Sequence, residues 1–209
     1  INKYIKSKNQ KLSNFWKTNI INENLMGKKI NLSKKISTVS TNSKIIGKNC
    51  IFVGLKGKNF DGNLFADEAI KNNAKVALVS DYIDIKNKNI FKVKNSLKTF
   101  SKISSVIRNV SNINTIAITG SSGKTSFKDL LATCLNKISP TSYSKNSFNN
   151  KFGVPESLFS IKYRDGFGVF EVGMDKKGEI NNLSKLINPN LGVITNISYA
   201  HIKNFKNLK

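Results

Sequence analysis

The chain has 209 residues, of which 39% are hydrophobic and 22% are charged, and its formal net charge is +23 at pH 7. This composition allows a buried core, but no apolar run reaches the roughly 18 residues of a membrane-spanning helix, so we expect no membrane span. The basic start of the chain is not followed by an apolar segment, so we expect no secretory signal. The two cysteines, Cys50 and Cys134, lie in apolar patterns that predict buried, reduced thiols and a cytoplasmic protein.

The positive charge would attract nucleic acid, anionic lipid or phosphorylated metabolites. Almost all of it comes from lysine, because Arg108 and Arg164 are the only arginines. Arginine is the side chain best suited to bidentate recognition of bases and phosphates, and the lysines are spread along the whole chain. We therefore expect a lysine-covered enzyme that acts on anionic substrates, with no nucleic-acid partner. A basic nucleic-acid-binding module is the alternative.

The first half of the chain predicts a small α/β domain. Residues 1–35 are polar and predict an extension that is a short helix with a loop or is partly disordered. The order strand, helix, strand that follows is typical of an α/β unit. Its expected elements are strands at 51–55, 76–79 and 90–93 and helices at 64–73 and 97–110, the last with Ser96 as its N-cap.

After a linker at 111–114, a second series predicts a parallel sheet covered on both faces. The fold class is therefore α/β, with two domains that we place at 36–111 and 112–209. The expected elements of the second domain are strands at 115–119, 168–172 and 191–195 and helices at 124–138 and 179–187, the last stopped by Asn188-Pro189.

The most specific motif connects the strand at 115–119 to the next helix, which is the context of a phosphate-binding loop. Glycine permits the tight turn, and the start of the helix supplies unpaired N–H donors. Compared with the standard pattern the loop is short, because Ile118 stands where the first glycine is expected. An ordinary Gly/Ser turn is the alternative. The candidate ATP-phosphate ligands are Gly120, Ser121, Ser122, Gly123, Lys124, Thr125 and Ser126.

Glu171 lies inside an apolar strand, where a lone carboxylate is costly unless it is paired or binds a metal. Together with the Thr125 hydroxyl it offers hard oxygen ligands for Mg²⁺. His201 is the only histidine, and it follows the strand at 191–195, where ligands of parallel sheets collect. A surface-facing glutamate and a solvated loop histidine are the alternatives.

Several ordered motifs resemble the Mur ligase superfamily over roughly residues 36–209. Beside the phosphate loop at 119–126, they lie at 51–57, 60–62, 147–150, 153–155, 170–174, 178–180, 188–189, 193–197 and 200–201. Asn149-Asn150 and the Gly-Val-Pro at 153–155 resemble the branch that adds D-alanyl-D-alanine, MurF, more than the sister branch that adds the third amino acid. Folate-polyglutamate ligases are expected to carry glycine after the lysine of this loop, where this chain has Thr125, so the chain resembles them less.

This resemblance implies a small UDP-sugar-binding domain followed by a P-loop-type ATP-binding domain that is incomplete at Lys209, with a third domain beyond it. The isolated chain is therefore expected to be inactive. Asn42 and Lys44 depart from the Asp and Arg of the family's uridine-site stretch. The implied roles are catalysis for Lys124, Glu171 and His201, Mg²⁺ binding for Thr125, Glu171 and His201, and substrate contacts for Ser43, Asn149 and Asn150.

The implied reaction is an ATP-dependent, ADP-forming amide ligation in peptidoglycan precursor synthesis, and hence in cell-wall biogenesis, cell shape and cell division. The terminal carboxylate of UDP-N-acetylmuramoyl-tripeptide would attack the γ-phosphate of ATP, and D-alanyl-D-alanine would then attack the acyl phosphate. We expect a cytoplasmic monomer that uses ATP and Mg²⁺. Another Mur-superfamily amino-acid ligase and a non-catalytic nucleotide-binding module are the alternatives.

Overall fold

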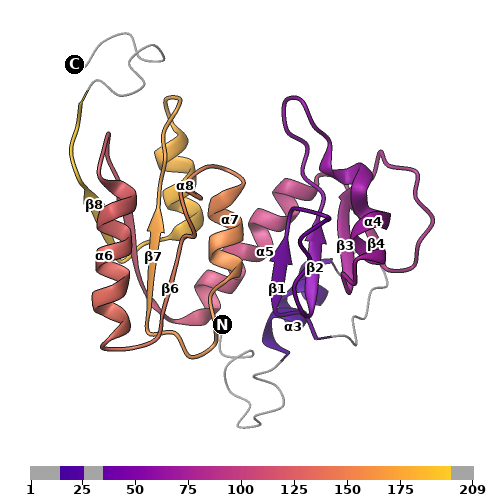
Figure 1. The fold of residues 1–209 in the computed structure, drawn as a ribbon, viewed down its shortest axis with the longest axis horizontal. Helices are drawn as coiled ribbons and strands as arrows, with labels where there is room; N and C mark the ends of the chain where they lie inside the picture. The colour runs from indigo at the N-terminus through magenta and orange to yellow at the C-terminus, as the bar shows by residue number, and fades with distance from the viewer. Residues whose placement is uncertain (1–14, 26–34, 199–209) are drawn as a thin grey trace. The chain divides into compact units, whose positions relative to one another are not determined.

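The computed structural model describes residues 15–25 and 35–198 of the chain. It divides into two compact units, Ile1–Val110 and Ser111–Lys209 (Figure 1). Within the described residues, none of the helices has both the length and the apolar character that a membrane crossing needs. Each unit is built around its own four-stranded parallel sheet, so the expected α/β class is confirmed.

The first unit has the strand order β1-β2-β3-β4. Helix α3 precedes the sheet, a 3-10 turn η1 and helix α4 connect β2 to β3, and helix α5 follows β4. The bounds are α3 Trp16–Leu25, β1 Thr38–Ser40, β2 Cys50–Val53, η1 Gly62–Phe65, α4 Ala66–Lys71, β3 Val76–Ser80, β4 Ile90–Val93 and α5 Ser96–Ser111.

The apolar runs in this half of the sequence form β2 and β3, the two central strands of the sheet. Every residue of β2 and β3 is buried, as expected for strands of a parallel sheet that is covered on both faces. Phe52 packs with Ala66 and Ala69 of α4 in the core of the unit. Burial of these apolar side chains is the main favourable term in forming the unit.

The N-terminal region contributes to the first unit more than its polar composition suggests. Within the described residues 15–25, α3 buries Trp16, Ile20 and Ile21. Thr18 accepts a hydrogen bond from the backbone N–H of Ile36 at 2.8 Å, and the Lys17 ammonium donates to the carbonyl of Ser37 at 3.2 Å. These contacts fasten α3 to the chain that enters β1.

The predicted N-cap of the long helix was wrong by one residue. Ser96 is the first helical residue, and its hydroxyl donates to the Gly54 carbonyl at 2.5 Å. Asn95 is the cap, because its Oδ1 accepts from the N–H of Lys98 at 2.8 Å. The Ser96 hydroxyl therefore bonds to the residue that follows β2 and does not cap α5.

The second unit has the strand order β6-β7-β5-β8, and all its pairs are parallel. Helix α6 packs on β6 and β7, whereas α7 and α8 contact each other, β7 and β5 (Figure 1). The chain crosses the sheet in one direction from β5 to β6 and in the other from β6 to β7 and from β7 to β8. Because crossovers between parallel strands are right-handed as a rule, this order puts α6 on one face and α7 and α8 on the other. The bounds are β5 Asn114–Thr119, α6 Lys124–Asn136, β6 Thr141–Tyr143, α7 Gly153–Phe159, β7 Phe167–Glu171, α8 Glu179–Ile187 and β8 Leu191–Ile194.

Two elements of the second unit, β6 and α7, were not predicted, because each is short and lacks a clear periodic pattern. The expectation of two buried cysteines was also wrong. Cys50 is buried, but Cys134 is exposed on α6. Apolar spacing along α6 continues onto its outer face, where Phe127 and Leu130 are also exposed.

A polar cluster closes the carboxyl edge of the first sheet. The Tyr82 hydroxyl donates to Asp61 Oδ2 at 2.7 Å, and Asn63, which is fully buried, donates to Asp61 Oδ1 at 2.7 Å. The Lys56 ammonium lies 5.2 Å from the centroid of the Tyr82 ring. Partial burial and the hydrogen bond to Asp61 raise the pKa of Tyr82 to about 12.

Replacing Tyr82 with phenylalanine should change the alkaline stability of the first unit. Because the folded pKa is raised, the stabilisation by this hydroxyl is fully present below the unfolded pKa of about 10 and is lost as pH rises through about 12. The difference in urea midpoint between the wild type and Tyr82→Phe should therefore shrink across that range. The fluorescence of Trp16, the single tryptophan, reports on the same unit.

Tyr143→Phe in the second unit is the matched control, and it should leave the Trp16 transition unchanged at every pH. A Tyr82→Phe difference that stays constant up to about pH 12 would contradict the assigned hydrogen bond.

Candidate functional site

The carboxyl ends of β5, β7 and β8 meet at one edge of the second sheet. In register, Ile118 of β5 lies beside Glu171 of β7 and Val193 of β8. Loops at this edge of an open α/β sheet are the usual place for ligands. The loop at 120–123 leaves β5 here and leads directly into α6, which begins at Lys124.

Two glycines shape this loop for different reasons. Gly120 has φ of 137°, and a Cβ built on it would lie 2.1 Å from Thr195 Oγ1, so no side chain fits. Gly123 has φ of 78° and is the N-cap of α6, and a Cβ on it would meet open space. The left-handed conformation favours glycine there. The N–H groups in the first turn of α6 have no carbonyl acceptor within the helix, so this turn can bind an anion.

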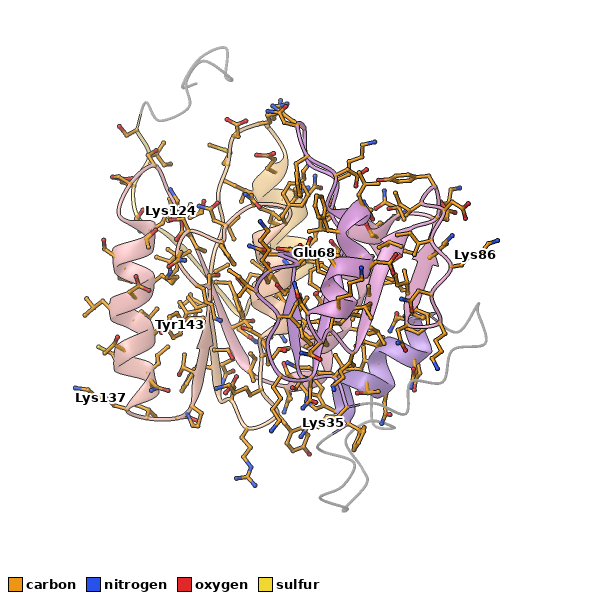
Figure 2. The ribbon with its side chains drawn as sticks, turned by 45° about the vertical axis from the view of Figure 1, so that its right-hand side comes forward. Lys35, Glu68, Lys86, Lys124, Lys137 and Tyr143 are labelled. Atoms are coloured by element: carbon orange, nitrogen blue, oxygen red, sulfur yellow. The ribbon has the colours of Figure 1, made fainter. Side chains whose placement is uncertain are left out.

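Lys124 starts the helix and turns back over the loop. Its ammonium donates to the carbonyl of Gly120 at 2.7 Å. Figure 2 shows Lys124 at one end of α6 and Lys137 beyond the other. The ammonium therefore lies at the end of α6 that carries the partial positive charge of the helix dipole.

The Glu171 carboxylate is the buried charge of the site, with an exposed fraction of 1%. Its Oε2 accepts a hydrogen bond from the Thr125 hydroxyl at 2.8 Å, and its Oε1 accepts one from the Asn149 amide at 2.8 Å. Both donors are neutral, and within residues 15–25 and 35–198 no ion pair includes Glu171. A buried carboxylate with only neutral donors is a good partner for a cation.

Asn149 is held by contacts that sequence analysis did not predict. The N–H of Gly173 donates to the Asn149 carbonyl at 2.7 Å, and a Cβ on Gly173 would lie 2.7 Å from Asn149 Oδ1. Lys128 of α6, which is fully buried, donates to the carbonyl of Asn146 at 2.7 Å in the same loop. Its ammonium also lies 3.2 Å from Asp129 Oδ1. The loop before α7 is thus fastened from both α6 and the end of β7.

The remaining predicted site residues have different surroundings. Asn150 is exposed, and its Oδ1 accepts from the N–H groups of Phe152 and Gly153, which starts α7. The backbone N–H groups of Ser121 and Ser122 donate to Asn196. Ser126 is exposed in the first turn of α6.

Ser43 belongs to the first unit, in the turn that follows β1. It is buried, and its hydroxyl donates to Glu68 Oε2 at 3.0 Å. The side chain of Asn72 donates to the Ser43 carbonyl at 2.9 Å. Ser43 therefore joins the turn after β1 to helix α4.

The structure thus brings the phosphate loop, Lys124, Thr125, Asn149 and Glu171 together at one edge. His201 lies outside the described residues. Among the residues that the structure does describe, no group of three or more His, Cys, Asp or Glu side chains could hold a metal, so a cation here would depend on hydroxyl and amide oxygens beside Glu171. Lys128 and Asn196 were missed, because neither residue type marks a site in sequence.

A short glycine loop that leads from a buried parallel strand into a helix, beside a buried acidic residue on the neighbouring strand, defines a P-loop-type α/β protein. Residues 118–209 match the family model of the Mur ligase middle domain. The UDP-N-acetylmuramoyl-tripeptide–D-alanyl-D-alanine ligase of Buchnera aphidicola is 35% identical over 178 residues, which cover 84% of this chain and 38% of the relative.

Solved structures agree with this match. MurF from Acinetobacter baumannii superimposes with a TM-score of 0.80 and 27% identity, over 90% of this chain and 42% of that one. MurF from Thermotoga maritima in complex with ADP gives a TM-score of 0.69 and 29% identity, over 79% and 38%. Residues 118–209 therefore belong to the Mur ligase middle-domain family, and the chain as a whole is similar to MurF. It spans about two fifths of the length of the MurF relatives that it matches.

Gly120→Ala should destabilise the second unit. Its Cβ would meet Thr195 and the backbone of Asn196, and the positive φ adds strain of about 1–3 kcal/mol. We expect faster hydrogen exchange in peptides from β5 and the start of α6, measured by mass spectrometry. Gly192→Ala is the control, because a Cβ at that position in β8 meets nothing within 4 Å. Equal exchange in both variants would contradict the close approach at Gly120.

Proposed function

We propose that this chain is the substrate-binding and ATP-binding part of a ligase that joins D-alanyl-D-alanine to UDP-N-acetylmuramoyl-tripeptide, with release of ADP and phosphate. The observation that carries the proposal is the loop at 120–125 beside the buried Glu171 carboxylate. The names of the relatives support the choice of substrates. The ADP complex of the Thermotoga relative supports the choice of nucleotide.

The residues present fit a nucleotide phosphate. The first turn of α6 points its N–H groups out of the helix start, and Gly123 leaves open space on its Cβ side. Lys124 is within reach of an anion at this helix end, because its ammonium already lies over the loop. We assign to Lys124 the stabilisation of negative charge as the γ-phosphate is transferred.

The oxygen atoms around Glu171 also fit Mg²⁺. Carboxylate and hydroxyl oxygens are the ligands this ion prefers, and Thr125 and Glu171 already lie within hydrogen-bond distance of each other. We propose that these two residues hold Mg²⁺, with His201 contributing as the family resemblance implies. The ion would offset the repulsion between the substrate carboxylate and the triphosphate.

The reaction then has two displacement steps. A carboxylate oxygen of the tripeptide forms a bond to the γ-phosphorus of ATP, and the bond to the β-phosphate oxygen breaks to release ADP. The amine of D-alanyl-D-alanine next forms the amide bond with the carbonyl carbon, loses a proton and expels phosphate. Lys124, Glu171 and His201 are the residues that we place around the transferred phosphate.

We assign recognition of the UDP-linked substrate to residues 36–111, together with the loop at 149–150. Asn149 lies at Glu171 and can contact both substrate and site, whereas Asn150 is exposed beside it. Because the Ser43 hydroxyl is bonded to Glu68, its proposed part is to fix the turn after β1. Because UDP-linked precursors and ATP are water-soluble metabolites, we propose a cytoplasmic enzyme. We also propose that it is a monomer and, since its positive charge is almost entirely lysine, that it has no nucleic-acid partner.

Nucleotide binding is the first test of the proposal. Lys124→Met should weaken binding of ADP by about tenfold or more, because a charge-assisted hydrogen bond to phosphate contributes about 1.5–3 kcal/mol. Isothermal titration with ADP and Mg²⁺ measures this loss. Lys137→Met, which removes a lysine from the other end of the same helix, is the matched control and should bind as the wild type does. The same loss in both variants would point to nonspecific charge attraction.

Ligase activity is the second test. The chain alone, and the chain joined to the remaining segment of a MurF relative, are assayed for phosphate release with UDP-N-acetylmuramoyl-tripeptide and different amine acceptors. We expect release by the joined protein only when D-alanyl-D-alanine is the acceptor. Preference for a single amino acid would indicate another ligase of the family. Salt-sensitive binding to RNA or DNA without turnover would instead support the binding-module alternative.

A further inference from the structure

We propose that Asn196 is a positioning residue for the phosphate loop, and that it restricts the phosphate ligands to the first turn of α6 and Lys124. The proposal rests on the proposed function, because it concerns the same nucleotide site. It excludes the backbone N–H groups of Ser121 and Ser122 from phosphate binding. We refer to the hydrogen bonds between residues 195–198 and residues 119–122 as the clasp.

Asn196 makes three of the bonds in the clasp. Its carbonyl accepts from the N–H of Ser121 at 3.0 Å, and its side-chain Oδ1 accepts from the N–H of Ser122 at 2.9 Å. Its Nδ2 donates to Ser122 Oγ at 2.7 Å. The side-chain amide thus acts as acceptor and donor toward a single residue of the loop, which fixes the orientation of Ser122.

Thr195 and Ser198 complete the clasp on either side. The N–H of Thr195 donates to the Thr119 carbonyl at 2.9 Å, and its hydroxyl donates to the Ser122 carbonyl at 2.6 Å. The N–H of Ser198 donates to Ser121 Oγ at 2.8 Å. The close approach of Thr195 also explains why Gly120 cannot carry a side chain.

These bonds decide which donors face a ligand. Each backbone N–H makes one good hydrogen bond, and those of Ser121 and Ser122 are used by Asn196. The earliest bond from α6 back into the loop is the one from the N–H of Phe127 to the Gly123 carbonyl, at 3.0 Å. The N–H groups between Ser122 and Phe127 are therefore the backbone donors that a phosphate can use, together with Lys124.

The clasp sets the loop before a ligand arrives, and such preorganisation lowers the entropic cost of binding. Asn196 and Ser122 are both exposed, so their side-chain bonds contribute little to the stability of the unit as a whole. A change at Asn196 should therefore affect phosphate binding more than folding. This difference separates a positioning role from a purely structural one.

The test compares Asn196→Ala and Asn196→Asp with the wild-type chain. Asn196→Ala removes two side-chain hydrogen bonds and should weaken ADP binding by about tenfold. Asn196→Asp keeps an acceptor for the Ser122 N–H, replaces the Nδ2 donor by a second carboxylate oxygen and adds a negative charge, so it should weaken ADP binding further. That additional loss should shrink as salt is raised, whereas the loss in Asn196→Ala should not, because only the former is electrostatic.

Asn181→Ala is the matched control, because Asn181 is exposed on α8, and it should bind ADP as the wild type does. Hydrogen exchange is the second measurement and needs no nucleotide. In Asn196→Ala the N–H of Ser122 loses its acceptor, so peptides covering Ser122 should exchange about tenfold faster, while peptides from β7 remain unchanged.

Unchanged exchange at Ser122 would overturn the inference, as would ADP affinity within about twofold of the wild type or an equal loss in Asn181→Ala. If the wild-type chain bound no ADP, the proposed nucleotide site would fail, while the exchange measurement would still decide whether Asn196 holds the loop.

Discussion

The candidate site of the second unit depends on the hydrogen bonds that the buried carboxylate of Glu171 accepts. Glu171 lies at the end of an otherwise apolar strand, where an unpaired charge would be strongly unfavourable. Thr125 from the helix and Asn149 from the loop before α7 both donate to it. The Glu171 carboxylate therefore links two segments that are distant in sequence at the edge of the sheet.

In contrast to the Glu171 carboxylate, which has only neutral partners, most polar groups of the phosphate loop already have hydrogen-bond partners within the protein. Lys124 bonds to the Gly120 carbonyl, and residues 195–198 take the N–H groups of Ser121 and Ser122. The N–H groups at the start of α6 remain available to a ligand, as do the ammonium protons of Lys124 that are not used by Gly120. A loop shorter than the standard pattern can thus present a small, fixed set of donors, because the segment that follows β8 holds it through residues 195–198.

The two units use the same architecture for different polar clusters. Both are parallel sheets whose carboxyl edges carry turns rich in hydrogen bonds. In the first unit, Asp61, Asn63 and Tyr82 form one cluster, with donors that hold the Asp61 pKa below its ordinary value even though partial burial raises it. This cluster fixes the turn after β2, in the unit to which we assign the UDP-linked substrate.

The sequence alone predicted the α/β class, the longer strands and helices, and the position of the glycine loop between β5 and α6, because apolar periodicity and glycine spacing are local signals. Only the tertiary structure decided that Asn95 and not Ser96 caps α5, that Cys134 is exposed, and that β6 and α7 exist. The roles of Lys128 and Asn196 were also beyond the sequence. Their partners are a backbone carbonyl 18 residues away and a loop 74 residues away, and such contacts exist only once the sheet has brought those segments together.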